Sequence, residues 1–343
     1  MHGGNIYSVS KNNNVKLNKI LDYSANMNDF IKINNIIIKS EYIKNYPEIK
    51  LDKYKKFLSN REFDIKNILI VPGLTYFIHK FISSLKNNII IIYPSFTEYI
   101  YSKYDYNKII INYDIIIKNP DIIKNYDFTA MFLVYPDNPT GNLINKDILF
   151  KLIDIAYNKN AYFFIDESFI YFVRNRKINE NEIINNYNNV IIGRSLTKIF
   201  SIPGLRLGYI ISNENNINSI EKYLEPWGIS EITLKYIEKL DFNEIISTPE
   251  KTEIERNYMI KNLLKMNFEL IGNPEANFIT IKLKGNYNGY LLKNYLENKN
   301  IMIRLLDDYD LFNENYIRLN VKKHYKNKIL IDNIKNFMVN KNE

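Results

Sequence analysis

The chain has 343 residues, of which 46% are hydrophobic and 24% charged, as in an ordinary globular protein. Its 46 basic and 38 acidic residues give a net charge of +8, but no run of five or six like charges occurs. This spread disfavours a nucleic-acid-binding arm or a charged membrane patch and instead suits anionic small substrates. At this length we expect two domains.

Residue types that are absent or rare exclude several kinds of site. With no cysteine in the chain, disulfides, thiolate catalysis and cysteine-bound metals are excluded. The three histidines, His2, His79 and His324, are far apart in the sequence, so we expect no histidine-built metal centre. The beginning of the chain lacks the pattern of a secretory signal, and no apolar run approaches a membrane span in length. We therefore expect a cytoplasmic protein.

The N-terminal region holds the first candidate ligand-binding residues. Residues 2–5 read His-Gly-Gly-Asn, and residues 22–26 read Asp-Tyr-Ser-Ala-Asn. Adjacent glycines let a backbone approach a ligand closely, and His and Asn side chains make directional hydrogen bonds. Taken alone, the same residues would more often form a frayed terminus.

Apolar strands alternate with helices from about residue 30 to residue 225. This alternation predicts a mostly parallel sheet that is covered by helices on both faces. The Ile-rich run at 88–93 is expected to be buried on both faces. Strands are predicted at 68–71, 88–93, 130–135, 161–165 and 190–193, and helices at 76–84 and 145–158.

Several of these strands end in turns that point to ligand binding. Residues 72–75 (Pro-Gly-Leu-Thr) join a strand to a helix, so free backbone N–H groups at a positive helix end form a generic anion site. Residues 136–141 (Pro-Asp-Asn-Pro-Thr-Gly) form a specific turn after a buried strand. Asp166 ends another strand, where a carboxylate points into the ligand crevice of an α/β sheet.

Lys198 is the most informative single residue. An apolar run ends at Ser195, Thr197 and Lys198 follow, and a Pro-Gly turn then leads to Arg206. A lysine between apolar neighbours loses solvation and its pKa falls, so the neutral amine can attack a carbonyl to form a Schiff base. Ser, Thr and Arg are residue types that hold a phosphate. A partner with an aldehyde and a phosphate is pyridoxal phosphate (PLP), although a solvated turn is the alternative reading of this lysine.

Two arginines lie in short β-like runs near the C-terminus. Arg304 follows Ile301-Met302-Ile303, and Arg318 lies within Tyr316–Asn320. An arginine is costly to bury without an anionic partner, so both are candidates for holding an anionic group. Exposed positions on edge strands are the alternative.

The segment from Ser195 to Lys198, followed by Pro-Gly-Leu-Arg-Leu-Gly-Tyr at 203–209, resembles the cofactor-lysine segment of the fold-type-I PLP enzymes, the aspartate aminotransferase superfamily. Further matches occur in the same order from His2 to Arg318, so the resemblance covers nearly the whole chain. It implies an α/β fold with a homodimer that shares its active sites. The implied parts are an N-terminal arm at 1–28, a large PLP-binding domain with a mostly parallel seven-stranded sheet at 29–228, and a smaller C-terminal α/β domain at 229–343.

The resemblance also implies roles for individual residues. Lys198 would carry the cofactor, Asp166 would pair with its pyridine nitrogen, and Asn138 would donate a hydrogen bond to its O3′ atom. Phe96 would stack on the ring, and Tyr46 of one subunit would reach the cofactor phosphate of the other. The residues that match the phosphate site are Gly73, Leu74, Thr75, Ser195 and Arg206.

Two branches of the superfamily differ at the start of the chain and at Phe169. The His-Gly-Gly-Asn start resembles the L-threonine-O-3-phosphate decarboxylases, whereas the related histidinol-phosphate aminotransferases usually lack it. Many aminotransferases have Tyr where this chain has Phe169, and the decarboxylases resemble this chain in having Phe. The resemblance implies that a phosphorylated amino-acid substrate is positioned by His2, Gly3, Asn26, Arg304 and Arg318.

The resulting hypothesis is a PLP-dependent decarboxylase. It would convert L-threonine O-3-phosphate to (R)-1-amino-2-propanol O-2-phosphate and CO2, a step towards the cobalamin nucleotide loop. The alternative is a histidinol-phosphate or other amino-acid aminotransferase, which would share the PLP-binding residues. A non-catalytic PLP-binding regulator is disfavoured, because such regulators normally carry an added DNA-binding domain and this sequence has no basic cluster.

Overall fold

The computed structural model describes residues 3–59, 62–85, 87–101, 107–175, 178–285 and 287–339. His2, one of the expected substrate-binding residues, lies outside these ranges. Within the described part of the chain, no helix is both long and apolar enough to cross a membrane. In the same ranges, no three His, Asp or Glu side chains are grouped so that they could hold a metal ion.

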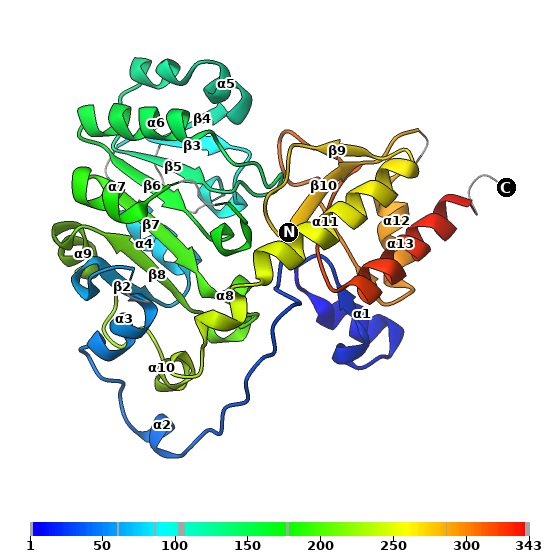
Figure 1. Ribbon diagram of the computed structural model, residues 1–343, viewed down its shortest axis with the longest axis horizontal. Coiled ribbons are helices and arrows are strands. Elements are labelled where there is room, and N and C mark those ends of the chain that lie inside the picture. Colours follow the sequence, from blue (N-terminus) through cyan, green and yellow to red (C-terminus); the bar gives the residue numbers. More distant parts are fainter. Residues whose placement is uncertain are drawn as a thin grey trace.

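A seven-stranded sheet forms the centre of the larger part of the molecule (Figure 1). The strand order is β2-β8-β7-β6-β5-β3-β4, and the neighbouring pairs are parallel except the two that β8 makes with β2 and β7. The prediction of a mostly parallel seven-stranded sheet is therefore confirmed. The strands are β2 (Ile68–Val71), β3 (Ile89–Tyr93), β4 (Lys108–Asn112), β5 (Ala130–Val134), β6 (Tyr162–Asp166), β7 (Val190–Ser195) and β8 (Gly208–Ser212).

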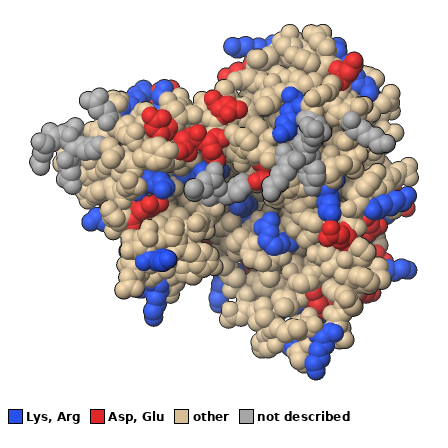
Figure 2. Space-filling model, turned by 180° about the vertical axis from the view of Figure 1, so that it is seen from behind, with Lys and Arg blue, Asp and Glu red and all other residues tan. Residues whose placement is uncertain are grey.

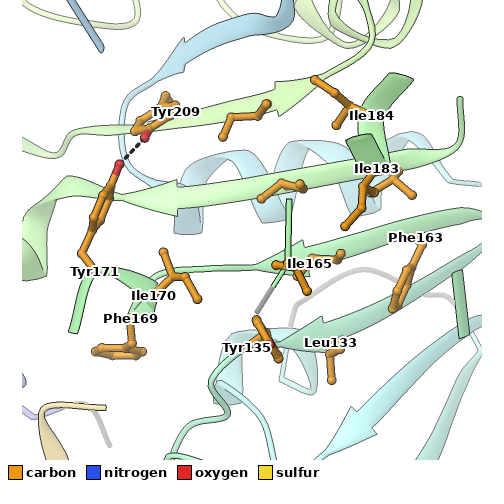
Figure 3. Close-up of a cluster of buried hydrophobic side chains, with 14 of the residues drawn as sticks. Leu133, Tyr135, Phe163, Ile165, Phe169, Ile170, Tyr171, Ile183, Ile184 and Tyr209 are labelled. Atoms are coloured by element: carbon orange, nitrogen blue, oxygen red, sulfur yellow. Dashed lines mark hydrogen bonds between the residues drawn. The ribbon is translucent and has the colours of Figure 1, made fainter. Parts of the chain in front are cut away.

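Helices cover both faces of this sheet, because each helix carries an apolar side that must be buried. On one face the core takes side chains from α3 (Asp52–Ser59), α5 (Tyr113–Lys118), α6 (Lys146–Asn158), α7 (Glu180–Asn186) and α10 (Glu231–Ile237). On the other face it takes side chains from α4 (Leu74–Ser84) and α9 (Glu214–Glu221). Figure 3 shows part of the first core, in which the hydroxyls of Tyr171 and Tyr209 lie 2.6 Å apart and share a hydrogen bond.

A four-stranded antiparallel sheet organises the smaller part, in the order β12-β13-β10-β9. A separate hydrophobic core joins it to the helices that cover it. The strands are β9 (Glu269–Ile271), β10 (Phe278–Lys282), β12 (Arg304–Leu305) and β13 (Tyr316–Asn320), and the helices are α11 (Thr248–Lys265), α12 (Gly289–Glu297) and α13 (His324–Val339).

The beginning of the chain lies against this smaller part rather than the larger one (Figure 1). Strand β1 (Leu21–Asp22) pairs in parallel with β11 (Ile301–Met302), and α1 (Ile6–Asn13) lies next to them. A long connection that contains the short α2 (Glu41–Lys44) then leads to α3, which packs on the large sheet. The N-terminal segment thereby reaches the space between the two sheets.

One predicted element differs from the structure. The Pro-Trp pair at 226–227 resembles the element that opens the long helix joining the two parts, which implies a helical stretch to about Lys265, but α10 ends at Ile237 and α11 begins at Thr248. The Asp241 carboxylate accepts a hydrogen bond from the backbone N–H of Asn243, which starts a separate 3-10 turn. Pro249 then occupies the first turn of α11, where a proline favours the start of a helix.

Basic and acidic side chains are interspersed over the molecular face shown in Figure 2. This arrangement follows from the sequence, in which the 46 basic and 38 acidic residues are distributed along the whole chain.

Candidate active site

A cavity lies between the two sheets, where the carboxyl ends of β5, β6 and β7 face the smaller part and the N-terminal segment. Side chains can converge there because parallel strands end at one edge of a sheet. Most of the residues singled out from the sequence line this one space. They are Gly3, Asn26, Leu74, Thr75, Phe96, Asn138, Asp166, Ser195, Lys198, Arg206, Arg304 and Arg318.

One end of the cavity gathers hydrogen-bond donors suited to a phosphate. Gly73 has a φ of +84° and immediately precedes α4, so the free N–H groups of the first turn of this helix are available. A methyl group on Gly73 would lie only 2.8 Å from a guanidinium nitrogen of Arg206, so a larger residue would displace the end of this arginine. The hydroxyls of Ser195 and Thr197 lie 2.8 Å apart beside them. The N-terminus of α4, the guanidinium of Arg206 and the two hydroxyls thus lie together at this end of the cavity.

Lys198 lies on the short helix α8 (Leu196–Ile199), directly after β7. Its backbone oxygen accepts a hydrogen bond of 3.0 Å from the N–H of Asn28, which anchors this turn to the N-terminal segment. Burial, followed by the positive charges of Arg318 and Arg206, lowers the pKa of its amine to about 8. A sizeable neutral fraction near pH 7 to 8 is what nucleophilic attack or proton transfer by a lysine needs.

Asp166 ends β6 and is almost fully buried. Its two carboxylate oxygens accept hydrogen bonds of 2.9 Å, one from the N–H of Ser168 and one from the hydroxyl of Tyr99. Burial raises the pKa of Asp166, and the bonds from Ser168 and Tyr99 partly offset this effect. A buried carboxylate in this setting is stabilised by a cation, such as a protonated ring nitrogen.

Arg318 connects the two parts of the molecule inside the cavity. It donates hydrogen bonds to the side-chain oxygen of Asn138 and, at 3.0 Å, to the backbone oxygen of Ser24. Because the oxygen of Asn138 is engaged, its amide N–H₂ is the group left to donate to a ligand. Within the described residues, Nε of Arg318 is buried and has no hydrogen-bond partner, which suits an anionic ligand. Burial lowers the pKa of Arg318 to about 10.

Two phenylalanines supply flat apolar walls. Phe96 is partly buried and lines the cavity, with its ring centroid 6.4 Å from that of Tyr99. Phe169 is buried, and its ring meets the ring of Phe278 edge to face at 4.9 Å. The ring of Phe278 also lies 5.3 Å from the guanidinium carbon of Arg318. Phe169 thus packs beneath the arginine and brings no hydroxyl to the cavity.

Arg304 differs from Arg318 in that it already has an anionic partner. Its Nη2 atom donates to both carboxylate oxygens of Asp308, at 2.7 and 2.6 Å. Tyr309, the next residue, is buried and lines the cavity near both arginines. Sequence reasoning missed Asp308, Tyr309 and Tyr99, because none of them is a defining residue of a motif or a periodic pattern.

The N-terminal segment closes one side of the cavity. The N–H of Gly4 donates to the hydroxyl of Ser24 at 2.8 Å, and this hydroxyl donates to the Asp22 carboxylate at 2.6 Å. A methyl group on Gly3 would lie 2.3 Å from the backbone oxygen of Ser24, so only glycine allows this approach. Asn26 lines the same side, with a buried side-chain oxygen that has no hydrogen-bond partner among the described residues.

Tyr46 is not part of the cavity within a single chain. It lies on the long connection between β1 and the large sheet and is 79% exposed. Its ring packs against that of Trp227, with the centroids 4.8 Å apart. Contact between Tyr46 and the cofactor of a second subunit therefore stays a prediction.

The geometry of the cavity fits PLP. Donors for a phosphate lie at one end, and flat apolar side chains, a buried carboxylate and the Asn138 amide lie around the middle. The amine of Lys198, whose pKa is lowered, lines the same cavity. Each of these groups matches a part of the cofactor: its phosphate, its ring, its ring nitrogen, its hydroxyl and its aldehyde.

Comparison with known proteins identifies a family. Residues 39–334 match the family described as aminotransferase class I and II. The adenosylcobalamin biosynthesis bifunctional protein CobDQ of Leptospira interrogans is 27% identical over 362 residues, which cover 98% of this chain and 41% of that protein. The chain thus spans less than half the length of this relative.

Two solved structures share the fold. The histidinol-phosphate aminotransferase from Clostridium acetobutylicum superimposes with a TM-score of 0.83 at 28% identity, covering 94% of this chain and 100% of the other. The L-threonine-O-3-phosphate decarboxylase from Porphyromonas gingivalis gives a TM-score of 0.75 at 21% identity, covering 87% and 92% of the two chains. The second likeness concerns the fold alone.

Proposed function

This chain belongs to the aminotransferase class I and II family, whose members use pyridoxal 5′-phosphate, and on this premise we propose that it is a decarboxylase of L-threonine O-3-phosphate. The bond between Cα and the carboxylate breaks and CO2 leaves. A proton then joins Cα, which gives (R)-1-amino-2-propanol O-2-phosphate. The proposal names one substrate and one reaction within a family that contains several.

The observation that carries the proposal is the position of the N-terminal arm. Gly3 lines the cavity, and the Gly4 N–H bond to Ser24 holds the arm there. Gly3 and Gly4, the described glycines of the His-Gly-Gly-Asn start that the resemblance associates with the decarboxylases, are therefore next to the site rather than remote from it. The alignment with the Leptospira cobalamin protein covers 98% of this chain and so includes most of this arm, which begins well before the family match at residue 39.

The charges of the cavity favour a substrate with two anionic groups. Arg304 and Arg318 approach from the smaller part, on the opposite side from Arg206 and the phosphate-binding turn. L-Threonine O-3-phosphate has one carboxylate and one phosphate. We assign the substrate contacts to Gly3, Asn26, Arg304 and Arg318, and the cofactor contacts to the residues named above.

When bound, PLP supplies an electron sink for the bond that breaks at Cα. Asp166, held by Tyr99 and Ser168, would pair with the ring nitrogen of the cofactor. The amine of Lys198, with its pKa near 8, carries the proton that Cα receives after CO2 has left. The carboxylate must lie free of a strong clamp to be lost as CO2, and Phe169, which lines the cavity, has no hydroxyl with which to hold it.

A histidinol-phosphate or other amino-acid aminotransferase is the second candidate. The likeness to the Clostridium structure favours it, and both reactions would use Lys198, Asp166 and Asn138. The two reactions differ in the bond that breaks at Cα, so product analysis separates them.

We also propose that the protein acts as a cytoplasmic homodimer. The long connection before α3 exposes apolar side chains, among them Ile37 at 82%, Ile43 at 71% and Tyr46 at 79%. Burying these side chains against a second copy would remove their apolar surface from water. Sedimentation at several protein concentrations tests this assembly.

The function is tested by incubating PLP-loaded protein with L-threonine O-3-phosphate, without any keto acid, and measuring CO2 and aminopropanol phosphate. We expect catalytic release of both by the wild type and of neither by Lys198→Ala. Formation of the pyridoxamine form of the cofactor from glutamate or histidinol phosphate, without CO2 release, would instead identify an aminotransferase.

A further inference from the structure

The short helix that carries Lys198 is held by a residue of the N-terminal arm. Helix α8 has only four residues, so its last carbonyl groups have no partner within the helix. Asn28, which is 4% exposed, donates to two of them. Its backbone N–H donates to the oxygen of Lys198 at 3.0 Å, and its side-chain Nδ2 donates to the oxygen of Ile199 at 2.8 Å.

The contact between Asn28 and this segment is reciprocal. The hydroxyl of Ser201, three residues after Lys198, donates to the backbone oxygen of Asn28. Ser201 has a φ of +52°, a left-handed conformation that costs free energy in a residue other than glycine. The hydrogen bond to Asn28 offsets part of this cost. Asn28 and the segment 198–201 therefore hold one another in a single arrangement.

The side chain of Asn28 also reaches the smaller part of the molecule. Its Nδ2 donates to the hydroxyl of Thr248, at the start of α11, at 3.3 Å, and its Oδ1 accepts from the N–H of Phe30 at 3.0 Å. A buried amide whose donors and acceptor are all used has one favoured orientation. The position of α8 is therefore tied to that of the arm.

The amine of Lys198 depends on being kept from water. Burial is the largest cause of its lowered pKa, Arg318 and Arg206 act in the same direction, and Asp22 of the arm raises the pKa by the smallest effect. Asp166 and Arg304 line the same cavity. If α8 loosened and water reached the amine, the largest effect would be lost, and loss of the weaker effect of Asp22 would not cancel it. The pKa would then rise towards 10.5.

We propose that Asn28 is a positioning residue for Lys198, because it fixes α8 to the N-terminal arm and thereby keeps the amine buried at the cavity. Gly3 and Asn26, which line the cavity, belong to the same arm. Docking of the arm thus completes the substrate side of the cavity and prepares the lysine together. The inference does not depend on the substrate, since both reactions considered above use Lys198.

The test measures how the reactivity of Lys198 depends on pH. Cofactor-free, full-length protein is mixed with PLP at a series of pH values, and absorbance gives the rate of reaction. The variants are Asn28→Ala, which removes the donor to Ile199, and Ser201→Ala, which removes the reciprocal hydrogen bond. Because free PLP ionises identically in every mixture, a difference between two pH profiles comes from the protein.

The matched control is Asn189→Ala. Asn189 is also a buried asparagine, and its Nδ2 donates to a backbone oxygen, that of Ala161, at the same distance of 2.8 Å. These two residues directly precede β7 and β6, whereas the cavity lies where the strands end. The control therefore removes an equivalent hydrogen bond from the same sheet without changing a contact of α8.

We expect the profile of Asn28→Ala to move by about one pH unit to higher pH relative to the wild type, so that the rate at pH 7 falls about tenfold. The profile of Ser201→Ala should move in the same direction by about half as much, since the two bonds from Asn28 remain. Asn189→Ala should keep the wild-type profile. Thermal unfolding of each variant shows whether the fold is retained.

Two outcomes overturn the inference: an Asn28→Ala profile that coincides with that of the wild type, or an Asn189→Ala profile that moves equally far. A merely structural role for Asn28 would lower stability and leave the profile in place. If Asn28→Ala does not fold, an unchanged profile of Ser201→Ala overturns the inference instead. Release of CO2 from L-threonine O-3-phosphate is a separate measurement, so the proposed function and the role of Asn28 can fail independently.

Discussion

Asp166 and Glu167 are adjacent in the chain, yet they meet opposite environments. Asp166 faces the cavity, where hydrogen bonds from Ser168 and Tyr99 only partly compensate its burial. Glu167 lies behind the sheet and forms a fully buried ion pair with Arg194 of β7, with 2.8 Å between Oε2 and Nε. Successive residues at a strand end point to opposite faces, so one step in sequence separates the two environments.

The ion pair behind the sheet is well compensated. Arg194 also donates to Glu180, and its guanidinium lies 5.4 Å from the ring centres of both Phe63 and Tyr171. On the cavity side, Lys198 and Arg318 have pKa values lowered by burial and Asp166 has a raised one. Charges that compensate one another thus stabilise the fold, whereas charges left without compensation mark a ligand site.

The largest expected effect comes from removing the cation of the buried ion pair behind the sheet. Arg194→Met leaves the carboxylates of Glu167 and Glu180 without their shared cation, and we expect the free energy of unfolding to fall by about 3 to 5 kcal/mol. Urea denaturation measures this loss of stability. The control is Arg174→Met, which removes an exposed ion pair with Glu253 and should change stability little. Equal losses in the two variants would contradict the comparison.

On the cavity side, Asp166→Asn should lower turnover without lowering stability. We expect turnover to fall by about 10² to 10³-fold, as for loss of a preorganised charge. The stability of the cofactor-free protein should not fall, because burial raises the pKa of Asp166 above its value in the unfolded chain, so that its negative charge costs free energy on folding. The neighbouring Glu167→Gln should lose stability instead. Turnover and thermal unfolding are measured on both, and a destabilised Asp166→Asn would refute the distinction.

The smallest expected effect is a pH dependence of cofactor capture. The amine of Lys198, with a pKa of about 8, is protonated below and neutral above that pH. The rate at which cofactor-free protein reacts with PLP should therefore rise about tenfold between pH 7 and pH 9 and then level off. Absorbance spectroscopy follows the reaction, with Lys198→Ala as the unreactive control. A rate that keeps rising towards pH 10.5 would indicate a solvated lysine.

The sequence predicted the parts of the site that local patterns define. The turns after β2 and β5, the end of β6 and the segment from Ser195 to Arg206 each combine an apolar strand with specific turn residues. Because parallel strands end at one edge, these separate motifs had to converge. The mostly parallel sheet that the alternation of strands and helices predicts is also confirmed, and it has the seven strands that the resemblance implies.

Contacts chosen by tertiary packing could not be predicted. Tyr99 is one of 28 tyrosines, and nothing in its neighbourhood indicates that it bonds Asp166. The pairing of Arg304 with Asp308 depends on a loop conformation between β12 and β13 that has no sequence signature. The interruption between α10 and α11 was missed because apolar residues continue through it, and only Asp241 and Pro249 mark the break.

The pairing of β1 with β11 has a consequence for how the protein is made. Leu21 and Asp22 lie beside Ile301 and Met302, and Arg318 then fixes Ser24. On the ribosome the first of these residues emerge roughly 280 residues before their partners, at a pace of about 5 to 20 residues per second. The large sheet can form in the meantime, whereas the arm has to wait. The N-terminal arm is thus among the last of these segments to settle, and the cavity becomes complete only after Arg318 has emerged.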